Sequence, residues 1–410
     1  TFPDIYDLGM SNLGLMILYD ALNKLPNVLA ERAFLPWVDM IAAMREAGMP
    51  LYSLETKRPL NAFDILGVTL PYEQVYTNLL EVLDLAEIPV RALERDESHP
   101  LVIAGGHATF NPEPVSAFVD AFLIGDGEEA MIEAVVSYEA TRNDSRESQL
   151  RALARLSGFY VPRFYDVHYH EGADGAVDGT IASIERKVPE AGLPVAKRVA
   201  SKMPHPVTKL IVPTVDVSHN RASIEISRGC TRGCRFCHAG MVVRPVRERP
   251  LEEILQATED ILAETGFEEV GLLSLSPSDY SRIDELVESM MERFGDRHLS
   301  ISLPALRADS FSVRLAEAIS QGRYTGFTLA PEAGSNRMRA TINKTIPSRQ
   351  VYDVAREVFE RGWQTIKLYF MIGLPGEEIE DVEAIVDMAR TVHLIGRRIH
   401  GRQAQVNVSV

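Results

Sequence analysis

The stretch "RGCTRGCRFC", residues 228–237, contains all three cysteines of the chain. They are Cys230, Cys234 and Cys237, and His238 follows the last one directly. The six residues before this stretch, "ASIEIS", alternate apolar and polar side chains, which predicts a strand that ends where the cysteine loop begins. Loops at the carboxyl ends of parallel strands carry the chemistry in β/α folds. The position of the loop therefore predicts a functional site at this point.

The chain after residue 220 alternates strand and helix patterns. Its strand candidates are "ASIEIS", "EVGLLSLS", "HLSISLP", "TGFTLAP", "TIKLYFMIGLP" and "RQAQVNVSV". Among the helical segments between them, Leu251–Glu264 starts next to Pro250, and Ser348–Glu360 has Ser348 as its expected cap. Six β/α units without a hairpin signal predict a partial (β/α)6 TIM-like barrel over residues 221–410. Because the chain stops in the strand-like "AQVNVSV", we expect this barrel to be truncated at its C-terminal end.

The N-terminal part shows a second alternation of short apolar runs and helical periods. Over residues 1–137 it runs through "DIYDL" and Leu13–Leu25, "FDILGVTL" and Tyr72–Leu85, then "PLVIAGG" and "DAFLIGDGEEAMIEAVV". This pattern predicts an α/β domain with a doubly wound, Rossmann-like parallel sheet. Residues 138–220 are more polar and rich in turns, which predicts a linker with a small β hairpin element.

Composition narrows the class of protein. The chain has 410 residues, of which 46% are hydrophobic and 24% charged, as in globular proteins. Its formal charge of -16 argues against generic binding to nucleic acid or to an anionic membrane surface. Neither an apolar run of about 18 residues nor a signal-peptide pattern is found, which predicts a cytoplasmic protein without a membrane span.

Four kinds of chemistry compete for the three cysteines. Haem attachment through Cys-x-x-Cys-His requires export, which nothing in the sequence signals, and it leaves Cys230 unexplained. A structural zinc would use His238 as fourth ligand, but adjacent Cys and His rarely reach one tetrahedral ion. Buried free thiols would have four Arg and three Gly as core neighbours, which is a poor match. An iron-sulfur cluster on three thiolates leaves one iron without a protein ligand, where a substrate or cofactor can bind.

The spacing Cys-x-x-x-Cys-x-x-Cys, with Phe236 before the third Cys, resembles the signature of radical S-adenosylmethionine (SAM) enzymes. The resemblance implies a [4Fe-4S] cluster on Cys230, Cys234 and Cys237, with SAM chelated at the fourth iron and Phe236 beside the cofactor. It further implies reductive cleavage of SAM to a 5'-deoxyadenosyl radical. The electron would come from an external donor of the flavodoxin or ferredoxin type.

Later strands carry segments that resemble the SAM-binding parts of this superfamily. "TLAPEAGSNRMR" ends a strand with Glu332, which would bind the ribose hydroxyls, and Arg337 would pair with the cofactor carboxylate. "KLYFMIGLPGE" resembles the segment whose turn, Gly373–Gly376, shapes the adenine side. An ordinary helix start or strand-to-helix turn would use the same residue types.

Two features of the later strands depart from the pattern or stand outside it. The Gly-Gly-Glu-like segment expected after the second strand is replaced by "LSLSPSD", so Ser274 and Ser276 are its candidate substitutes. Lys367 lies inside a predicted strand, where a side chain pointing into the barrel would need a partner for its charge.

The N-terminal part resembles the cobalamin-binding-type domain that precedes many radical SAM enzymes. "VIAGGHATFNPEPV" and "DAFLIGDGEEA" carry this resemblance, which makes Gly105 and Gly106 candidate contacts of cobalamin. The opening "DLGMSNLG" lacks the Asp-x-His-x-x-Gly arrangement that supplies a lower axial His. His107 is a candidate substitute, but a surface or capping role is the favoured interpretation of this residue. Retention of the fold with loss of cobalamin is the other interpretation.

Seven arginines lie between residues 221 and 249, against two acids, Glu225 and Glu248. They predict a locally positive barrel mouth, which suits a cofactor carboxylate, an anionic cluster or RNA, as in the related tRNA methylthiotransferases. The prediction is thus a radical SAM enzyme of unknown substrate, with methyl transfer as its leading reaction if cobalamin is bound. The alternatives are methylthiotransferase-like modification of RNA or protein, and a redox-sensing iron-sulfur protein without catalysis.

Overall fold

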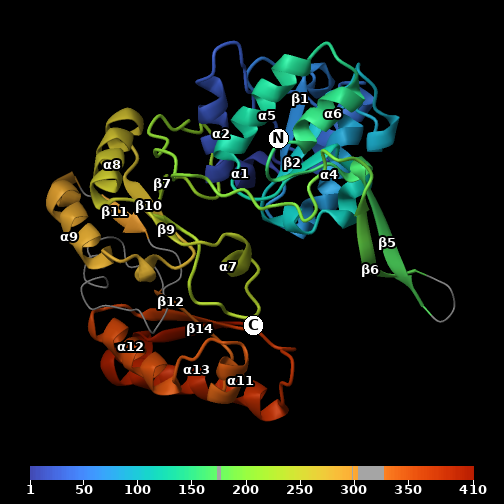
Figure 1. The fold of residues 1–410 in the computed structure, drawn as a ribbon. Coiled ribbons are helices and arrows are strands. Elements are labelled where there is room, and N and C mark those ends of the chain that lie inside the picture. The colour runs from blue at the N-terminus through green and yellow to red at the C-terminus, as the bar shows by residue number, and fades with distance from the viewer. Residues whose placement is uncertain (173–176, 298, 303–326) are drawn as a thin grey trace. The chain divides into compact units, whose positions relative to one another are not determined.

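The computed structural model describes residues 1–172, 177–297, 299–302 and 327–410 (Figure 1). The chain divides into two compact units. Unit 1 comprises Thr1–Pro204 and Pro213–Asn220, and unit 2 comprises His205–Val212 and Arg221–Val410. No described helix has the length and hydropathy that a membrane span requires.

A four-stranded sheet forms the centre of unit 1. Its strands are β1 (Ile65–Thr69), β2 (Leu101–Gly105), β3 (Ala121–Leu123) and β4 (Phe159–Tyr160), in that spatial order. The first three are parallel, with Ile65 opposite Leu101 and Ile103 opposite Ala121. The Rossmann-like parallel sheet is thus confirmed. Its strand order runs without reversal, and β4 pairs antiparallel to β3, which the sequence patterns did not predict.

The α-helices in the described part of unit 1 are α1 (Tyr6–Gly9), α2 (Leu13–Asn23), α3 (Val38–Glu46), α4 (Tyr76–Leu85), α5 (Glu128–Thr141) and α6 (Arg146–Ala154). The predicted strand in "DIYDL" is wrong, because these residues lead into helix α1. A β-bridge in this region instead joins Phe2 to Phe34. Both rings lie so close to Gly9 that a Cβ there would come within 2.7 Å of each, so this segment is fixed by aromatic packing.

Residues 138–220, expected as a linker, contribute α6 and β4 to unit 1. The α6 side chains Leu150 and Leu153 are fully buried in its core. The segment also contains a hairpin of β5 (Tyr165–Glu171) and β6 (Val177–Arg186), whose tip lies outside the described residues. Most of this segment is therefore part of a folded unit.

The described residues of unit 2 form two three-stranded parallel sheets. The first has the order β11-β10-β7, with β7 at Ala222–Glu225, β10 at Glu269–Leu273 and β11 at Ser300–Ser302. The second has the order β12-β13-β14, with β12 at Phe327–Glu332, β13 at Thr365–Phe370 and β14 at Gln405–Ser409. The short strands β8 (Ser227–Arg228) and β9 (Arg247–Glu248) pair antiparallel.

The helices of unit 2 follow its strands in β/α order. Those in the described part of unit 2 are α7 (Ala239–Val242), α8 (Leu251–Thr265), α9 (Ile283–Phe294), α11 (Asn336–Thr341), α12 (Ser348–Glu360) and α13 (Ile379–His400). Figure 1 shows α12 and α13 on one side of the second sheet, and their apolar side chains pack with Ile366 and Leu368 of β13. The opposite face of β13 is not covered in this way, since Lys367 and Tyr369 are exposed.

Each strand predicted after residue 220 is present, and the β/α order agrees with the predicted partial barrel. Residue 298 and residues 303–304 of "HLSISLP", and residues 325–326 of "TGFTLAP", lie outside the described part of the chain. The predicted helices at 251 and 348 begin where expected. The predicted cap at Ser348 is wrong, because Pro347 holds the N-cap position and Ser348 is the first helical residue.

Candidate functional site

The cysteine loop begins where β7 and β8 end, at the carboxyl edge of the first sheet of unit 2. Gly229 has φ 93°, and a Cβ there would lie 2.6 Å from the carbonyl oxygen of Pro245, so the tight approach requires glycine. Gly233 also has a positive φ, 67°. Cys234 is buried, and Cys230 and Cys237 are half-buried free thiols. The backbone thus turns sharply twice and presents three sulfurs from one short loop.

Backbone amides of the loop donate to two of the sulfurs. The N–H of Arg232 donates to Sγ of Cys230 at 3.5 Å, and the N–H of Gly240 donates to Sγ of Cys237 at 3.3 Å. Such donors stabilise thiolates and tune iron-sulfur clusters. Among the described residues, no three His, Cys, Asp or Glu side chains converge on a single metal ion. A cubane does not need that convergence, because each thiolate binds its own iron atom.

The far end of α11 holds the cysteine loop from another part of unit 2. The N–H of Arg235 donates to the carbonyl of Ile342 at 3.0 Å, and Nδ2 of Asn343 donates to the carbonyl of Gly233 at 2.9 Å. Phe236, the predicted cofactor neighbour, has a relative exposure of 39%. The loop is therefore fixed by hydrogen bonds to its backbone, while the Phe236 ring is exposed enough to contact a ligand.

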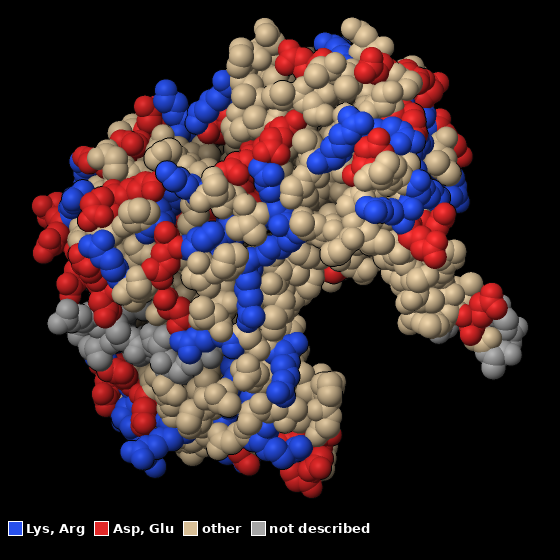
Figure 2. Space-filling model, viewed as in Figure 1, with Lys and Arg blue, Asp and Glu red and all other residues tan. Residues whose placement is uncertain are grey.

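Acidic side chains compensate much of the predicted positive mouth. Among the described residues, at least four of its seven arginines have carboxylate partners, through the pairs Arg221–Glu269, Arg228–Glu225, Arg232–Asp279 and Arg249–Glu253. Three of these acids follow residue 249, so counting charges within residues 221–249 overestimated the net positive charge. Figure 2 likewise shows basic and acidic side chains interspersed on the visible face.

Glu332 ends β12 in an unusual backbone conformation. Its φ is 68°, which is rare for a residue with a Cβ, and the β12–β13 register shifts between Leu329 and Glu332. Oε1 of Glu332 accepts a hydrogen bond from Nζ of Lys344 at 2.9 Å, and the side chains are only 17% and 6% exposed. Backbone strain of this kind concentrates at ligand-binding sites. The structure thus holds the side chain of Glu332, the residue predicted to bind the ribose, in one defined and largely buried position.

Arg337 has protein partners in this structure. Its guanidinium pairs with Asp381 and also donates to the carbonyl of Gly376 at 3.1 Å. The hydroxyl of Ser335 also binds Asp381 and, as the largest cause, lowers the pKa of this carboxyl. Arg337 therefore ties the start of α13 to α11, and its predicted contact with a cofactor carboxylate stays a prediction.

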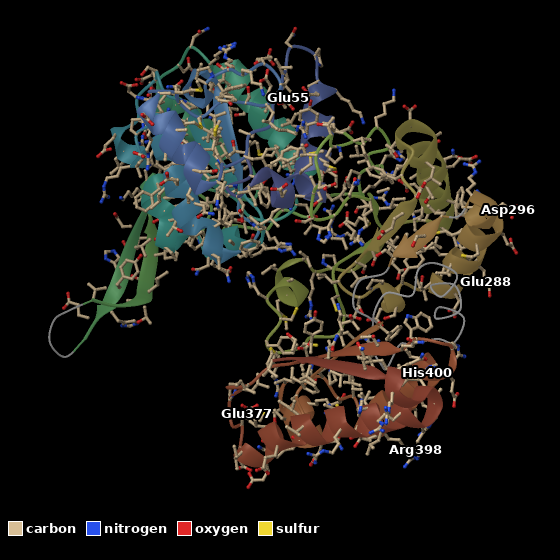
Figure 3. The ribbon with its side chains drawn as sticks, turned by 180° about the vertical axis from the view of Figure 1, so that it is seen from behind. Glu55, Glu288, Asp296, Glu377, Arg398 and His400 are labelled. Atoms are coloured by element: carbon tan, nitrogen blue, oxygen red, sulfur yellow. The ribbon has the colours of Figure 1, made fainter. Side chains whose placement is uncertain are left out.

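The turn after β13 has the geometry that its glycines suggest. Gly373 and Gly376 have φ values of 82° and 73°, and the N–H of Gly373 donates to Oε2 of Glu377 at 2.6 Å. Figure 3 shows Glu377 and His400 near opposite ends of α13, so Glu377 marks the carboxyl edge of the second sheet. The turn therefore lies at the same edge as Glu332.

The serines after β10 are bound within the protein. The hydroxyls of Ser274 and Ser227 are 2.7 Å apart, and the hydroxyl of Ser276 donates to Asp279 at 2.7 Å. Asp279 also binds Arg232 of the cysteine loop. These contacts join the second strand to the cysteine loop and give both hydroxyls a structural role. Lys367 is exposed, so the expected need for a partner to a buried charge does not arise.

The two predicted glycines of unit 1 have different surroundings. Gly106 has φ 115°, and a Cβ there would lie 2.4 Å from the carbonyl oxygen of Leu70, so packing against the neighbouring strand end already requires this glycine. Gly105, in contrast, has no neighbour within 4 Å of its Cβ position. His107 begins a 3-10 turn directly after them. Space for a ligand at this sheet edge is thus found at Gly105.

Comparison with protein families now identifies the chain. Residues 14–162 match the model described as radical SAM proteins, N-terminal, and residues 224–389 match the radical SAM superfamily model. The second match contains the cysteine loop, Glu332 and the Gly373–Gly376 turn. The chain is therefore a member of the radical SAM superfamily of enzymes.

Known relatives agree with this membership. An uncharacterised protein of Methanocaldococcus jannaschii is 25% identical over 95% of this chain and 72% of its own length. A tRNA-2-methylthio-N(6)-dimethylallyladenosine synthase of Petrotoga mobilis is 25% identical over 44% of this chain and 43% of the relative. The ribosomal protein uS12 methylthiotransferase of Chlamydia felis is 24% identical over 56% of this chain and 50% of its own length. The chain thus spans at most half of these two methylthiotransferases.

Two solved structures share the fold over nearly the whole chain. The cobalamin- and [4Fe-4S]-bound radical SAM methyltransferase TsrM from Kitasatospora setae has a TM-score of 0.61 at 15% identity, covering 95% of this chain and 72% of its own. The cobalamin-dependent radical enzyme OxsB, with aqua-cobalamin and SAM bound, has a TM-score of 0.60 at 15% identity. The match covers 97% of this chain and 54% of the OxsB chain. Both halves of the chain therefore have the fold of cobalamin-dependent radical SAM enzymes.

The sequence patterns missed the residues that surround Glu332. Lys344 follows it by twelve positions, and Asn343 combines φ 57° with its bond to the cysteine loop. Arg339 is fully buried and donates to the carbonyls of Ala333 and Ile346 at 2.7 and 2.6 Å. The only available signal was the density of polar residues in "SNRMRATINKT", which an exposed helix also explains.

Proposed function

We propose that this chain cleaves SAM reductively at a [4Fe-4S] cluster on Cys230, Cys234 and Cys237. The observation that carries the proposal is the cysteine loop itself, which offers three sulfurs and is joined through Asn343 to the segment that holds Glu332. The donor set fits the cluster, because three thiolates leave one iron open to a cofactor. When bound, the cluster would supply the electron that breaks the S–C5' bond of SAM, giving methionine and a 5'-deoxyadenosyl radical.

The chain's own residues would bind and orient the cofactor. The amides of Arg232 and Gly240 would stabilise the cluster thiolates. The carboxylate of Glu332 would accept hydrogen bonds from the ribose hydroxyls. The Gly373–Gly376 turn and the ring of Phe236 would shape the adenine side, and an electron-carrier protein of the flavodoxin or ferredoxin type would deliver the electron.

We further propose methyl transfer with cobalamin bound at the carboxyl edge of the unit 1 sheet. The fold likeness of both halves to TsrM and OxsB supports this reaction. The open space at Gly105 fits a ligand there, whereas Gly106 is explained by packing within the protein. When bound as methylcobalamin, the cofactor would supply a methyl group for a substrate radical.

A methylthiotransferase-like reaction on RNA or protein is the second candidate. It is supported by the likeness of part of the chain to two methylthiotransferases. The carboxylate partners of four arginines argue against a broad basic surface for RNA in this part of unit 2. We therefore rank it below cobalamin-dependent methyl transfer.

Reductive cleavage is tested on the anaerobically reconstituted protein. With dithionite and SAM, the wild type should release 5'-deoxyadenosine and methionine, detected by liquid chromatography with mass spectrometry. Cys234→Ala removes one cluster ligand and should abolish release, whereas Arg349→Met, at a side chain that is 91% exposed, should not change it. A cluster-loaded wild type that releases no 5'-deoxyadenosine would favour a redox-sensing protein instead.

A further inference from the structure

One short segment of unit 2 contacts both parts of the proposed SAM site. It consists of Ile342, Asn343 and Lys344, directly after α11. Ile342 and Asn343 bind the cysteine loop through its backbone at Arg235 and Gly233, at 3.0 and 2.9 Å. Lys344 binds the carboxylate of Glu332 at 2.9 Å. The segment therefore connects the cluster ligands to the predicted ribose ligand.

The Glu332–Lys344 pair is unusual because both side chains are largely buried. A buried lysine is costly unless an acid compensates its charge. In the described part of the chain, Lys344 is the only ion-pair partner of Glu332. The lysine also restrains a side chain that already starts from a left-handed backbone conformation. Each carboxylate oxygen has two lone pairs, so Oε1 can accept from Lys344 and still leave three acceptor sites for a diol.

The segment that carries Lys344 is itself held firmly. The buried guanidinium of Arg339 donates to Ala333 and Gly334, directly after Glu332, at 2.7 and 2.9 Å. It also donates to Ile346, two residues after Lys344, at 2.6 Å. The N–H of Lys344 donates to the carbonyl of Arg339 at 2.8 Å. One side chain thus fixes the backbone on both sides of the ion pair.

Asn343 has the backbone conformation that this connection needs. Its φ of 57° is left-handed, a region that Asn tolerates better than other residues with a side chain. This turn lets the Asn343 amide bind the cysteine loop while the next residue binds Glu332. Two neighbouring side chains therefore serve the two halves of one site.

We propose that Lys344 and Asn343 are positioning residues for SAM: Lys344 orients Glu332 toward the ribose hydroxyls, and Asn343 fixes the cysteine loop relative to Glu332. This inference rests on the proposed function, since it takes SAM as the ligand. It assigns Lys344 no contact with the reacting atoms. Its effect should therefore depend on the ribose hydroxyls and on the Glu332 carboxylate.

The test compares SAM with its 2'-deoxy analogue in calorimetric binding to the cluster-loaded protein. The wild type should bind SAM about tenfold more tightly, because a hydrogen bond to a carboxylate contributes about 1.5 kcal/mol. Lys344→Met should weaken SAM binding about tenfold and leave the analogue nearly unchanged, so the ratio falls toward one. A merely structural lysine would weaken both ligands equally.

Two further variants make the result specific. Glu332→Gln should show the same lowered ratio, and adding Lys344→Met to it should cause no further loss, because the lysine acts through this carboxylate. Lys344→Gln keeps a polar group of similar length and provides the measurement if Lys344→Met does not fold. An unchanged ratio in a folded Lys344 variant would overturn the inference alone. A wild type that does not bind SAM would overturn the proposed function with it.

The variant Asn343→Gly tests the side-chain amide of Asn343 apart from its left-handed backbone conformation. Glycine keeps access to the left-handed conformation but removes the hydrogen bond to Gly233. We expect a chelator to remove iron from this variant roughly fivefold faster than from the wild type, the equivalent of one lost hydrogen bond. Equal rates of iron loss would overturn the role assigned to Asn343.

Discussion

Single residues decide the geometry of the unit 2 site. Glu332 is held in a left-handed conformation at a strand end, and the ion pair with Lys344 fixes its carboxylate. Arg339 holds the backbone next to Glu332 and near Lys344, because its buried guanidinium donates to the carbonyls of Ala333 and Ile346. Burial lowers the pKa of this guanidinium, which also donates to Oδ1 of Asn336 and to Oγ of Ser348, both at 2.6 Å. Two buried side chains, Lys344 and Arg339, which are not predicted ligands of SAM, therefore fix the geometry around Glu332.

Arg339→Met should destabilise unit 2 by about 3 kcal/mol, because several buried carbonyls would lose their donors at once. Urea unfolding can follow this through Trp363, which is 3% exposed in unit 2, whereas the other tryptophan, Trp37, is 64% exposed in unit 1. Arg349→Met, at a nearby exposed position, is the matched control and should shift stability little. Equal unfolding midpoints for the two variants would contradict the supporting role of Arg339.

Both candidate cofactor sites lie at the ends of β-strands. In unit 2, the cysteine loop follows β8, Glu332 ends β12 and the Gly373–Gly376 turn follows β13. In unit 1, Gly105 ends β2 and Gly106 follows it directly. The same sequence feature, a double glycine after an apolar run, thus combines a position with open space and a position needed for packing.

The two glycines of unit 1 should respond differently to alanine. Gly106→Ala should cost roughly 2 kcal/mol or more of stability, because it adds a Cβ at a positive φ against a backbone carbonyl. Gly105→Ala should fold with near wild-type stability, measured by circular dichroism during urea unfolding. If cobalamin approaches Gly105, the same variant should retain less corrinoid when produced with the vitamin, as read from visible absorbance. Undiminished corrinoid in Gly105→Ala would contradict a cofactor contact at this residue.

Elements were easier to predict than side-chain partners. The strand patterns at β1, β2 and the strands of the two parallel sheets of unit 2 are bounded by turn residues, so they are local in the sequence. The antiparallel pairing of β4 and the helix at Tyr6–Gly9 were missed because neither has a distinctive periodicity. The three cysteines lie within one short stretch of sequence, so their grouping was visible there, and their role as cluster ligands stays a prediction. The pairings of Lys344, Glu269 and Asp279 could not be predicted, because each of these residues binds a side chain from another element of unit 2.

The whole molecule combines two folded units with separate cores. The core of unit 1 extends from Ala33 to Ala191, and that of unit 2 from Ala222 to Ala404. Each unit carries one candidate cofactor site at a strand edge, and nearly the entire chain shares its fold with TsrM and OxsB. The proposed function requires that a cluster on the cysteine loop keeps one iron open and binds SAM there.

Electron paramagnetic resonance of the reduced, cluster-loaded protein tests this claim most directly. Addition of SAM should shift the g values of the reduced [4Fe-4S] signal, because the cofactor would become a ligand of the open iron. Lys344→Met should show the same shift at higher SAM concentrations, since the lysine acts on the ribose side. A spectrum that does not change at saturating SAM, in protein shown to contain the cluster, would contradict SAM binding at the open iron.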